Sequence, residues 1–469
     1  MAEAAQPVLT KYDAIILGSG QAGNPLASAL SSKGKRTALI ERALVGGTCV
    51  NYGCTPTKTL VASAEVAYVA RRAREYGIKV EDVSVDMPAV RERKRGMVQK
   101  WREGSEKRLR EAKLVDLIYG EGCFVGPKQL RVQLNDGGEQ TLAADLIVID
   151  TGLTVNIPPV EGLASVPYLD NASVMELEEV PGHLIVLGGG YVGLEFAQMF
   201  RRFGSRVTVV QKGKQLLSGE DSDVADEVAA IRREDGIEIL LETKTEAVSA
   251  IGTNVRLSIR VKGESRELEG SHLLVAAGRR PNIDALNLPA AGIVTDARGY
   301  IRVNDKLETS APGVYAVGDV NGGPAFTHVS YDDFRVLQTN LLEGGNHSVA
   351  GRLYRYCVFI DPQLGRIGLS ENEAVKQGRR VRVAKLPMTS VARALETGRS
   401  RGFMKVLVDP RTEEILGAAV LGAEGGEVMS MIQVAMMGKL KYTALHDAIF
   451  AHPLFAESLN NLFNKFEGE

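Results

Sequence analysis

Cys49 and Cys54 are the two residues whose type and spacing point most directly to chemistry. They lie five positions apart in the segment GGTCVNYGCTPTK (46–58), next to an expected helix start whose first turn suits Pro56. Two cysteines placed in this way can close a strained intrahelical disulfide, and the positive end of a helix favours the thiolate once that bond is opened. The pair therefore predicts thiol–disulfide redox chemistry.

Two other interpretations of the pair stay open at this point. Both cysteines could be small buried apolar residues, or they could bind zinc, although C-x4-C with no second Cys/His pair is poor zinc spacing. The other two cysteines, Cys123 and Cys357, are expected to be inert. Four cysteines are too few for a disulfide-stapled secreted scaffold, so we expect a reducing cytoplasmic setting, in which a close pair is more often catalytic than structural.

A glycine-rich turn precedes the cysteines. The segment GSGQAG (18–23) follows an apolar strand expected at 12–17 and opens a helix expected at 23–33. In such a G-x-G-x-x-G turn the first glycine allows the tight turn, the second lets a pyrophosphate approach, and the third lets helix and strand pack. Glu41 ends the next strand, where a carboxylate can accept hydrogen bonds from an adenosine ribose. The pattern predicts a dinucleotide site that includes Gly18, Gly20, Gly23 and Glu41.

The same pattern recurs 170 residues further along the chain, in the segment GGGYVG (188–193), and predicts two similar nucleotide-binding domains. Gln211 stands where Glu41 stands in the first copy, and Lys212 and Lys214 follow it. Loss of the carboxylate removes the repulsion of a 2′-phosphate, which favours NADPH. NADH stays possible, because both lysines could be solvated loop residues. The glycines of this second site are Gly188, Gly190 and Gly193.

Length and composition limit the number of domains and the class of protein. The chain has 469 residues, too long for one ordinary core, which predicts about two to four domains. A net charge of −2 gives no field that would recruit nucleic acid or an anionic membrane. We expect no signal peptide and no membrane span, because the N-terminus lacks the required pattern and no apolar run reaches roughly 18 residues. After about residue 350 strands and helices no longer alternate, which predicts an α+β domain.

Five strings resemble, in order and over nearly the whole chain, the class I flavoprotein disulfide reductases, a family that includes glutathione reductase, dihydrolipoamide dehydrogenase and mercuric reductase. These strings are GSGQAG, GGTCVNYGCTPTK, GGGYVGLE, YAVGDV and FAHPLFAE. The resemblance implies an α/β fold with two Rossmann-like dinucleotide-binding domains and a C-terminal α+β dimerisation domain. The implied ranges are 1–157 and 285–350 for a discontinuous FAD domain, 158–284 for an NAD(P) domain and 351–469 for dimerisation.

The resemblance also implies catalytic roles. Cys54 resembles the charge-transfer thiol beside the flavin, and Cys49 resembles the interchange thiol that meets the substrate. His452 resembles the acid–base residue that reaches the active site of the other subunit of a homodimer, with Glu457 orienting the imidazole and raising its basicity. An ion pair beside flavin N5 is implied for Lys58 and Glu195.

Cofactor contacts follow from the same resemblance. Asp319, in YAVGDV, resembles the carboxylate that binds the FAD ribityl chain, and Thr327 resembles the residue whose backbone meets the pyrimidine end of the flavin. Tyr191 resembles the aromatic lid over the nicotinamide site, and no resident metal is expected. The other expected contacts of the two cofactors are Gly47, Thr48, Lys58, Gly122, Thr151, Gly152, Gln211, Lys212 and Gly278.

Electrons would then pass from NAD(P)H through the flavin and the cysteine pair to an electrophilic acceptor. The segments 326–336, 392–394 and 452–463 resemble the mercuric-reductase-like, reactive-chlorine-resistance flavoproteins, which reduce hypothiocyanous acid and are linked to Cu(II) and Hg(II). True mercuric reductases carry a C-terminal cysteine pair that the tail NKFEGE (464–469) lacks, which argues against efficient Hg(II) reduction.

Several alternatives remain. A dihydrolipoamide dehydrogenase is possible, although Gln211 replaces the acid expected for NAD(H), and glutathione reductase is less favoured because Gln211 and Leu217 do not match its NADPH-binding arginines. Two alternatives belong to other functional classes. One is a flavin-binding scaffold without catalysis, and the other is an oxidase or monooxygenase that uses the flavin alone. The basic segment 91–113 is expected to be a solvated helix, and the methionines around 429–437 are expected to pack in a core or interface.

Overall fold

The computed structural model describes residues 9–466 and divides into two compact units. The first unit comprises residues 1–60, 88–156 and 278–352, and the second comprises 61–87, 157–277 and 353–469. The cut between them falls inside helix α3 (Cys54–Arg72). The three domain ranges expected from the sequence remain a prediction, and the last three residues of the expected cysteine-free tail lie outside the described residues.

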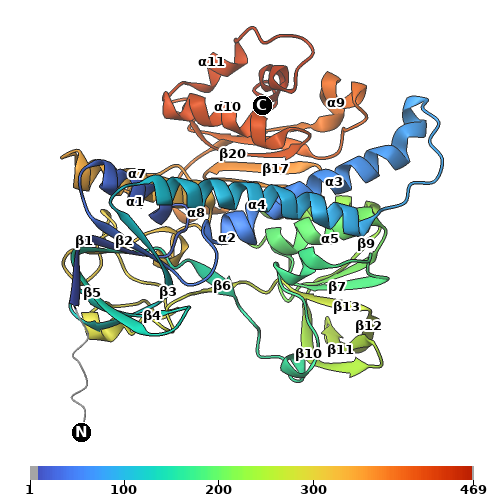
Figure 1. Ribbon diagram of the computed structural model, residues 1–469. Helices are drawn as coiled ribbons and strands as arrows, with labels where there is room; N and C mark the ends of the chain where they lie inside the picture. Colours follow the sequence, from blue (N-terminus) through green and yellow to red (C-terminus); the bar gives the residue numbers. More distant parts are fainter. Residues whose placement is uncertain (1–8, 467–469) are drawn as a thin grey trace. The chain divides into compact units, whose positions relative to one another are not determined.

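A sheet with a parallel core forms the centre of the first unit (Figure 1). Strands β3, β2, β1, β5 and β15 pair in this order with parallel neighbours, and β4 pairs antiparallel with both β3 and β5. Their bounds are β1 (Leu9–Leu17), β2 (Thr37–Glu41), β3 (Val115–Gly126), β4 (Gln129–Leu134), β5 (Glu139–Ile149) and β15 (Val314–Ala316). A separate two-stranded pair consists of β6 (Leu153–Val155) and β14 (Arg279–Pro281).

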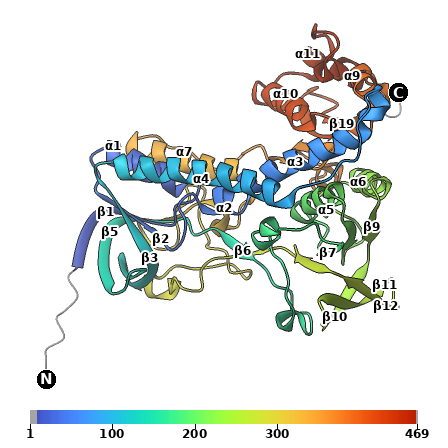
Figure 2. The same ribbon diagram turned by 45° about the vertical axis from the view of Figure 1, so that its right-hand side comes forward.

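Helices cover one face of this sheet, where α1, α7 and the C-terminal end of α4 pack together (Figure 2). Ile16 of β1 points into this core, whereas its neighbour Ile15 points into a second core on the opposite face. Because the strands are buried on both faces, they read as continuous apolar runs rather than as alternating ones. The helices of this unit are α1 (Gly23–Ser32), α2 (Gly47–Asn51), the start of α3, α4 (Met87–Glu111) and α7 (Thr327–Leu342).

The described residues of the second unit form three sheets. A four-stranded parallel sheet has the order β13-β7-β8-β9, and an antiparallel three-stranded sheet has the order β10-β11-β12. Their bounds are β7 (His183–Leu187), β8 (Arg206–Val210), β9 (Ile237–Leu240), β10 (Thr243–Ile251), β11 (Asn254–Val261), β12 (Glu264–Gly270) and β13 (His272–Val275). Helices α5 (Tyr191–Phe203) and α6 (Ser222–Glu234) pack against strands of the parallel sheet.

The third sheet is antiparallel, with the order β16-β17-β20-β19-β18, and helix α10 lies along β17 and β20 (Figure 1). The strands are β16 (Arg355–Val358), β17 (Gln363–Gly368), β18 (Arg382–Pro387), β19 (Phe403–Val408) and β20 (Ile415–Gly422). The helices are α8 (Glu371–Lys376), α9 (Ala392–Glu396), α10 (Gly425–Met437), α11 (Tyr442–His446) and α12 (Ser458–Leu462).

The expected α/β fold class with its βαβ repeat is confirmed. The units β1-α1-β2 and β7-α5-β8 lie where the two glycine patterns placed them. Two local expectations need refinement. The basic segment forms α4, but Lys94 is buried within it, and the methionines of α10 divide between a buried Met429 and an exposed Met437. Within residues 9–466, none of the helices has the length and apolar character needed to cross a membrane.

Candidate active site

The glycine turn after β1 is forced by a close backbone approach. Gly18 has φ +98°, and a Cβ built on it would lie 2.3 Å from the carbonyl oxygen of Asp150, directly after β5. A Cβ on Gly23, where α1 begins, would lie 2.6 Å from the carbonyl oxygen of Gly18. Only glycine fits at either position, and the N-terminus of α1 is thereby placed as a phosphate-binding end.

The side chains of Glu41 and Gln211 each accept a hydrogen bond from a backbone N–H of their own glycine turn. Glu41 Oε2 accepts hydrogen bonds from the backbone N–H and the hydroxyl of Ser19, at 3.1 and 2.6 Å. Gln211 Oε1 accepts one from the N–H of Gly189, at 3.0 Å. Ser19 and Gly189 are themselves 170 residues apart, so the repeat extends to these contacts. The amide of Gln211 thus holds its turn as Glu41 does, without a negative charge.

The cysteine pair spans a break between two helices, which corrects the expectation of an intrahelical pair. Cys49 lies in α2, and Cys54 is the first residue of α3. Pro56 stands in the first turn of α3, as expected, and its ring prevents helical continuation at the residue four positions earlier. Helix α2 therefore ends before α3 begins. A Cβ on Gly47, the first residue of α2, would lie 2.9 Å from the Cα of Gly20, so α2 packs directly on the first glycine turn.

The two thiols interact with each other and with α7. Cys54 Sγ lies 3.3 Å from Oγ1 of Thr327, the first residue of α7. The pKa of the Cys49 thiol is raised, because this thiol hydrogen-bonds to the sulfur of Cys54 and is partly buried. Cys54, the first residue of α3, stands at a helix end that stabilises a thiolate.

A second loop of the first unit carries Asp319, in the short helix η5 (Gly318–Asn321). Burial raises the pKa of Asp319, and the charge of Arg279, whose Nη1 lies 3.3 Å away, opposes that rise. Asp333 holds the loop in place, since its Oδ2 accepts the N–H of Gly318 at 2.8 Å. Asp333 is in turn bound by Arg352 at 2.6 Å.

His452 and Glu457 form the expected pair in the second unit. His452 Nδ1 lies 2.9 and 3.1 Å from the two carboxylate oxygens of Glu457. A carboxylate only accepts, so Nδ1 donates and Nε2 is the nitrogen left to exchange a proton. His452 is exposed. The arrangement is therefore suited to acid–base chemistry on a group that approaches from outside this chain.

Other expected site residues fall into the two units separately. Lys58 lies in α3 of the first unit, and Glu195 lies in α5 of the second, where its Oε1 accepts the N–H of Phe359 at 2.9 Å. Their pairing remains a prediction. Further first-unit residues are Thr48, Gly122, Thr151, Gly152 and Gly278. Further second-unit residues are Gly188, Gly190, Tyr191, Gly193 and Lys212.

Comparison with known proteins identifies the family. The pyridine nucleotide-disulphide oxidoreductase family matches residues 12–333, and the dimerisation domain of the same family matches residues 354–463. The chain belongs to the pyridine nucleotide-disulphide oxidoreductases. Members of this family are flavin-dependent enzymes that use a pyridine nucleotide, so the chain is an oxidoreductase of the flavoprotein disulfide reductase type.

Two relatives and one solved structure illustrate the likeness. The probable pyridine nucleotide-disulfide oxidoreductase RclA of Escherichia coli is 37% identical, over 97% of this chain and 99% of its own length. The mercuric reductase of Staphylococcus aureus is 31% identical, over 96% of this chain and 81% of its own. The structure of the Cu(II) complex of E. coli RclA, a HOCl-induced flavoprotein disulfide reductase, matches with a TM-score of 0.89 at 36% identity, covering 97% of this chain and 99% of that one. Dihydrolipoyl dehydrogenases also match.

The first unit fits the flavin that this oxidoreductase family uses. Its glycine turn leaves no room for side chains where a pyrophosphate would approach. Thr151 Oγ1 is buried and finds no hydrogen-bond partner among the described residues. A bound ligand could supply the missing hydrogen bond. FAD would be held by this turn together with Glu41 and the loop of Asp319, and it would supply hydride transfer when bound.

Asp150, Asp333 and Arg352 were not identified from the sequence. Asp150 directly precedes the expected cofactor residues Thr151 and Gly152, and Asp333 lies in the segment 326–336, so their neighbourhood was the available signal. Their contacts, however, join parts of the chain that are far apart, as in the 2.7 Å bond from the N–H of Gly23 to Asp150.

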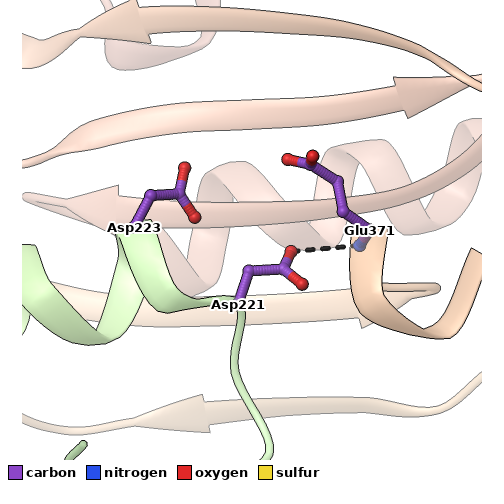
Figure 3. A group of neighbouring side chains, drawn as sticks. All are labelled: Asp221, Asp223 and Glu371. Carbon is purple, nitrogen blue, oxygen red and sulfur yellow. Dashed lines mark hydrogen bonds between the residues drawn. The ribbon is translucent and has the colours of Figure 1, made fainter. Parts of the chain in front are cut away.

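One group of carboxylates in the second unit has the spacing of a metal site. Asp221, Asp223 and Glu371 point toward one another, and the N–H of Glu371 binds Asp221 (Figure 3). The ammonium of Lys405 lies among them, at 3.0, 2.8 and 2.6 Å from the three carboxylates. Burial alone would lower the pKa of Lys405, but its hydrogen bonds to the carboxylates raise it overall. The side chain of Lys405 therefore provides the cation of this cluster.

Replacing Lys405 by methionine should lower the free energy of unfolding by about 3–5 kcal/mol, because it leaves three neighbouring carboxylates without their buried cation. Urea unfolding of the holoprotein, with the midpoint compared at constant slope, measures the change. The matched control is Lys385→Met, since Lys385 also binds Asp223, at 2.9 Å, but is 32% exposed. That variant should lose about 1 kcal/mol or less. Equal losses in the two variants would show that the cluster is not held by Lys405.

Proposed function

We propose that this chain is an NADPH-dependent flavoprotein reductase that passes electrons through Cys49 and Cys54 to a small electrophilic acceptor. The acceptor class is an oxidised sulfur species such as hypothiocyanous acid, or a soft or borderline metal ion such as Cu(II) or Hg(II). The observation that carries the proposal is the cysteine pair in contact with Thr327 of α7 and packed on the dinucleotide turn. The names of the relatives support the acceptor class, because they include a HOCl-induced reductase in complex with Cu(II) and mercuric reductases.

The chemistry of the pair suits such an acceptor. The thiolate of Cys49 attacks the sulfur of hypothiocyanous acid, and the oxygen leaves as water after taking up a proton. Cys54 then attacks the sulfur of Cys49 and displaces thiocyanate, which restores the disulfide. The dithiol loses two electrons and hypothiocyanous acid gains them, so the step balances. FAD, held at the glycine turn and the loop of Asp319, would supply the electrons of NADPH that reopen the disulfide.

The proposal also includes a homodimer in which the acid–base residue of each active site comes from the other subunit. The match of residues 354–463 to a dimerisation domain supports a homodimer, and large apolar side chains of this region, including Val434, Met437 and Ile449, are exposed in the single chain. We propose that His452 of the partner subunit serves Cys49, whose raised pKa requires a base at neutral pH. A cytoplasmic setting, in which thiols stay reduced, completes the proposal.

The first test compares acceptors. Oxidation of NADPH and NADH by the pure protein should be fast with hypothiocyanous acid or Cu(II) and slow with lipoamide and glutathione disulfide. Cys49→Ser should lower kcat by about 10³-fold or more, because it removes the nucleophile. Cys123→Ser, a change outside the pair, is the matched control and should leave the rate unchanged. Fast turnover of lipoamide would instead support a dihydrolipoamide dehydrogenase.

Two further outcomes address the remaining alternatives. A colourless purified protein that binds no flavin would contradict the enzyme proposal and favour a scaffold. Turnover that persists in Cys49→Ser would indicate an oxidase or monooxygenase that uses the flavin alone.

The choice of coenzyme should depend on the charge at residue 211. Gln211→Glu should lower kcat/KM for NADPH by about tenfold or more, which corresponds to about 1.4 kcal/mol of repulsion from the 2′-phosphate, and should leave NADH much less affected. A glutamate can still accept the N–H of Gly189, as Glu41 accepts that of Ser19, but it loses the 3.1 Å bond that the Gln211 amide donates to the carbonyl oxygen of Gln215. Gln215→Glu is the control for an added charge in the same loop. An equal loss with both coenzymes would contradict NADPH selectivity.

Loss of the base should show in the pH profile. His452→Gln should lower kcat by about 10²–10⁴-fold at neutral pH. The loss should be smaller at alkaline pH, where hydroxide can take the proton of the Cys49 thiol in place of the missing base. His446→Gln is the control, since His446 is bound instead by Asp447 and Asn464. A uniform loss of rate at all pH values would argue against a role in deprotonating Cys49.

A further inference from the structure

Asp150 places a buried carboxyl group between the two loops that fit FAD. Its Oδ2 accepts the N–H of Gly23 at 2.7 Å, at the start of α1. The same oxygen would lie 2.7 Å from a Cβ built on Gly20, and Oδ1 would lie 2.9 Å from one built on Gly318. The carboxyl group therefore touches the glycine turn on one side and the loop of Asp319 on the other. Asp150 is only 7% exposed.

The fold itself does not require this carboxyl group. In the second repeat a Cβ on Gly188 would lie 2.3 Å from the carbonyl oxygen of Ala276, just as a Cβ on Gly18 would lie 2.3 Å from that of Asp150. Ala276 thus occupies the place of Asp150 in a turn of the same construction. Because a methyl group is sufficient there, the carboxyl of Asp150 is a specific feature of the first site.

The surroundings of Asp150 disfavour a negative charge. Burial raises the pKa of Asp150 well above its ordinary value. The carboxylates of Asp319 and Asp333 add to that rise, whereas hydrogen bonds from the backbone N–H groups of Gly23 and Ala22 oppose it. The pyrophosphate of FAD at the same turn would add further negative charge. The charged groups of the neighbouring elements are Asp319 with its partner Arg279, Asp333 with its partner Arg352, and Glu41.

We propose that Asp150 is an FAD-binding residue that acts as a neutral carboxylic acid, so that binding of FAD is coupled to the uptake of a proton at every pH at which Asp150 is ionised in the free protein. A neutral carboxyl group still accepts the N–H of Gly23 and gains one O–H donor, which an anionic pyrophosphate can accept. An ionised one would have no donor and would repel the phosphates. The inference rests on flavin binding by this chain, as the proposed function does, but it is independent of the electron acceptor.

The test measures FAD affinity against pH. Holoprotein is diluted at fixed ionic strength between about pH 5.5 and 9, and the fluorescence of released FAD gives the Kd. Since the protonated form binds FAD, Kd should rise with pH, by up to about tenfold per unit once Asp150 is ionised in the free protein. Asp150→Asn, which keeps a neutral group of the same size, should make Kd nearly independent of pH. The control is Asp145→Asn, because Asp145 lies on the same strand β5 and is fully exposed, and it should keep the wild-type slope.

A second measurement needs no variant. Calorimetry of FAD binding to the wild-type apoprotein, in two buffers of different ionisation enthalpy, should show the uptake of up to one proton per FAD over the pH range in which Kd rises. A pH-independent Kd without proton uptake overturns the inference and leaves the proposed function intact. An unchanged pH slope in Asp150→Asn also overturns it, because another group must then titrate. Failure of the wild-type protein to bind FAD at any pH overturns the inference together with the proposed function.

Discussion

The first unit depends on one close approach of backbone to backbone. The turn at Gly18 passes so near the carbonyl oxygen of Asp150 that a side chain would clash, and the positive φ of Gly18 lets β1 end and α1 begin within a few residues. This approach brings the N-terminus of α1 to the carboxyl ends of β1 and β5, where parallel sheets bind their ligands. Helix α2, which carries Cys49, packs on the same turn. The redox pair is therefore positioned by the loop that fits the cofactor.

Strong local patterns explain which parts of the fold were predictable. The two βαβ units combine buried apolar strands with glycine turns, so a short stretch of sequence determines each of them. The antiparallel sheet of β10 to β12 was not anticipated, because β12 (Glu264–Gly270) exposes most of its side chains and carries little apolar signal. Its pairing is set by contacts along the whole hairpin rather than by any one segment.

The candidate site was predictable in its residues and less so in its geometry. The spacing of Cys49 and Cys54 suggested one helix, but the break before α3 follows from Pro56, whose effect falls four residues earlier. The role of Asp150 could not be read from its neighbours in sequence, since its importance comes from contacts with Gly23 and Gly318, which only the folded chain brings together. Sequence patterns thus identify reactive groups more readily than the buried groups that surround them.

The shared geometry of Glu41 and Gln211 has an evolutionary consequence. A carboxylate and an amide of the same length make the same bond to their glycine turns. The codons for glutamate and glutamine differ by a single base, so one mutation changes the charge at this position and keeps the bond from the N–H of the glycine turn. The charge at such a position can therefore change in one mutational step, while the hydrogen bond to the turn is preserved.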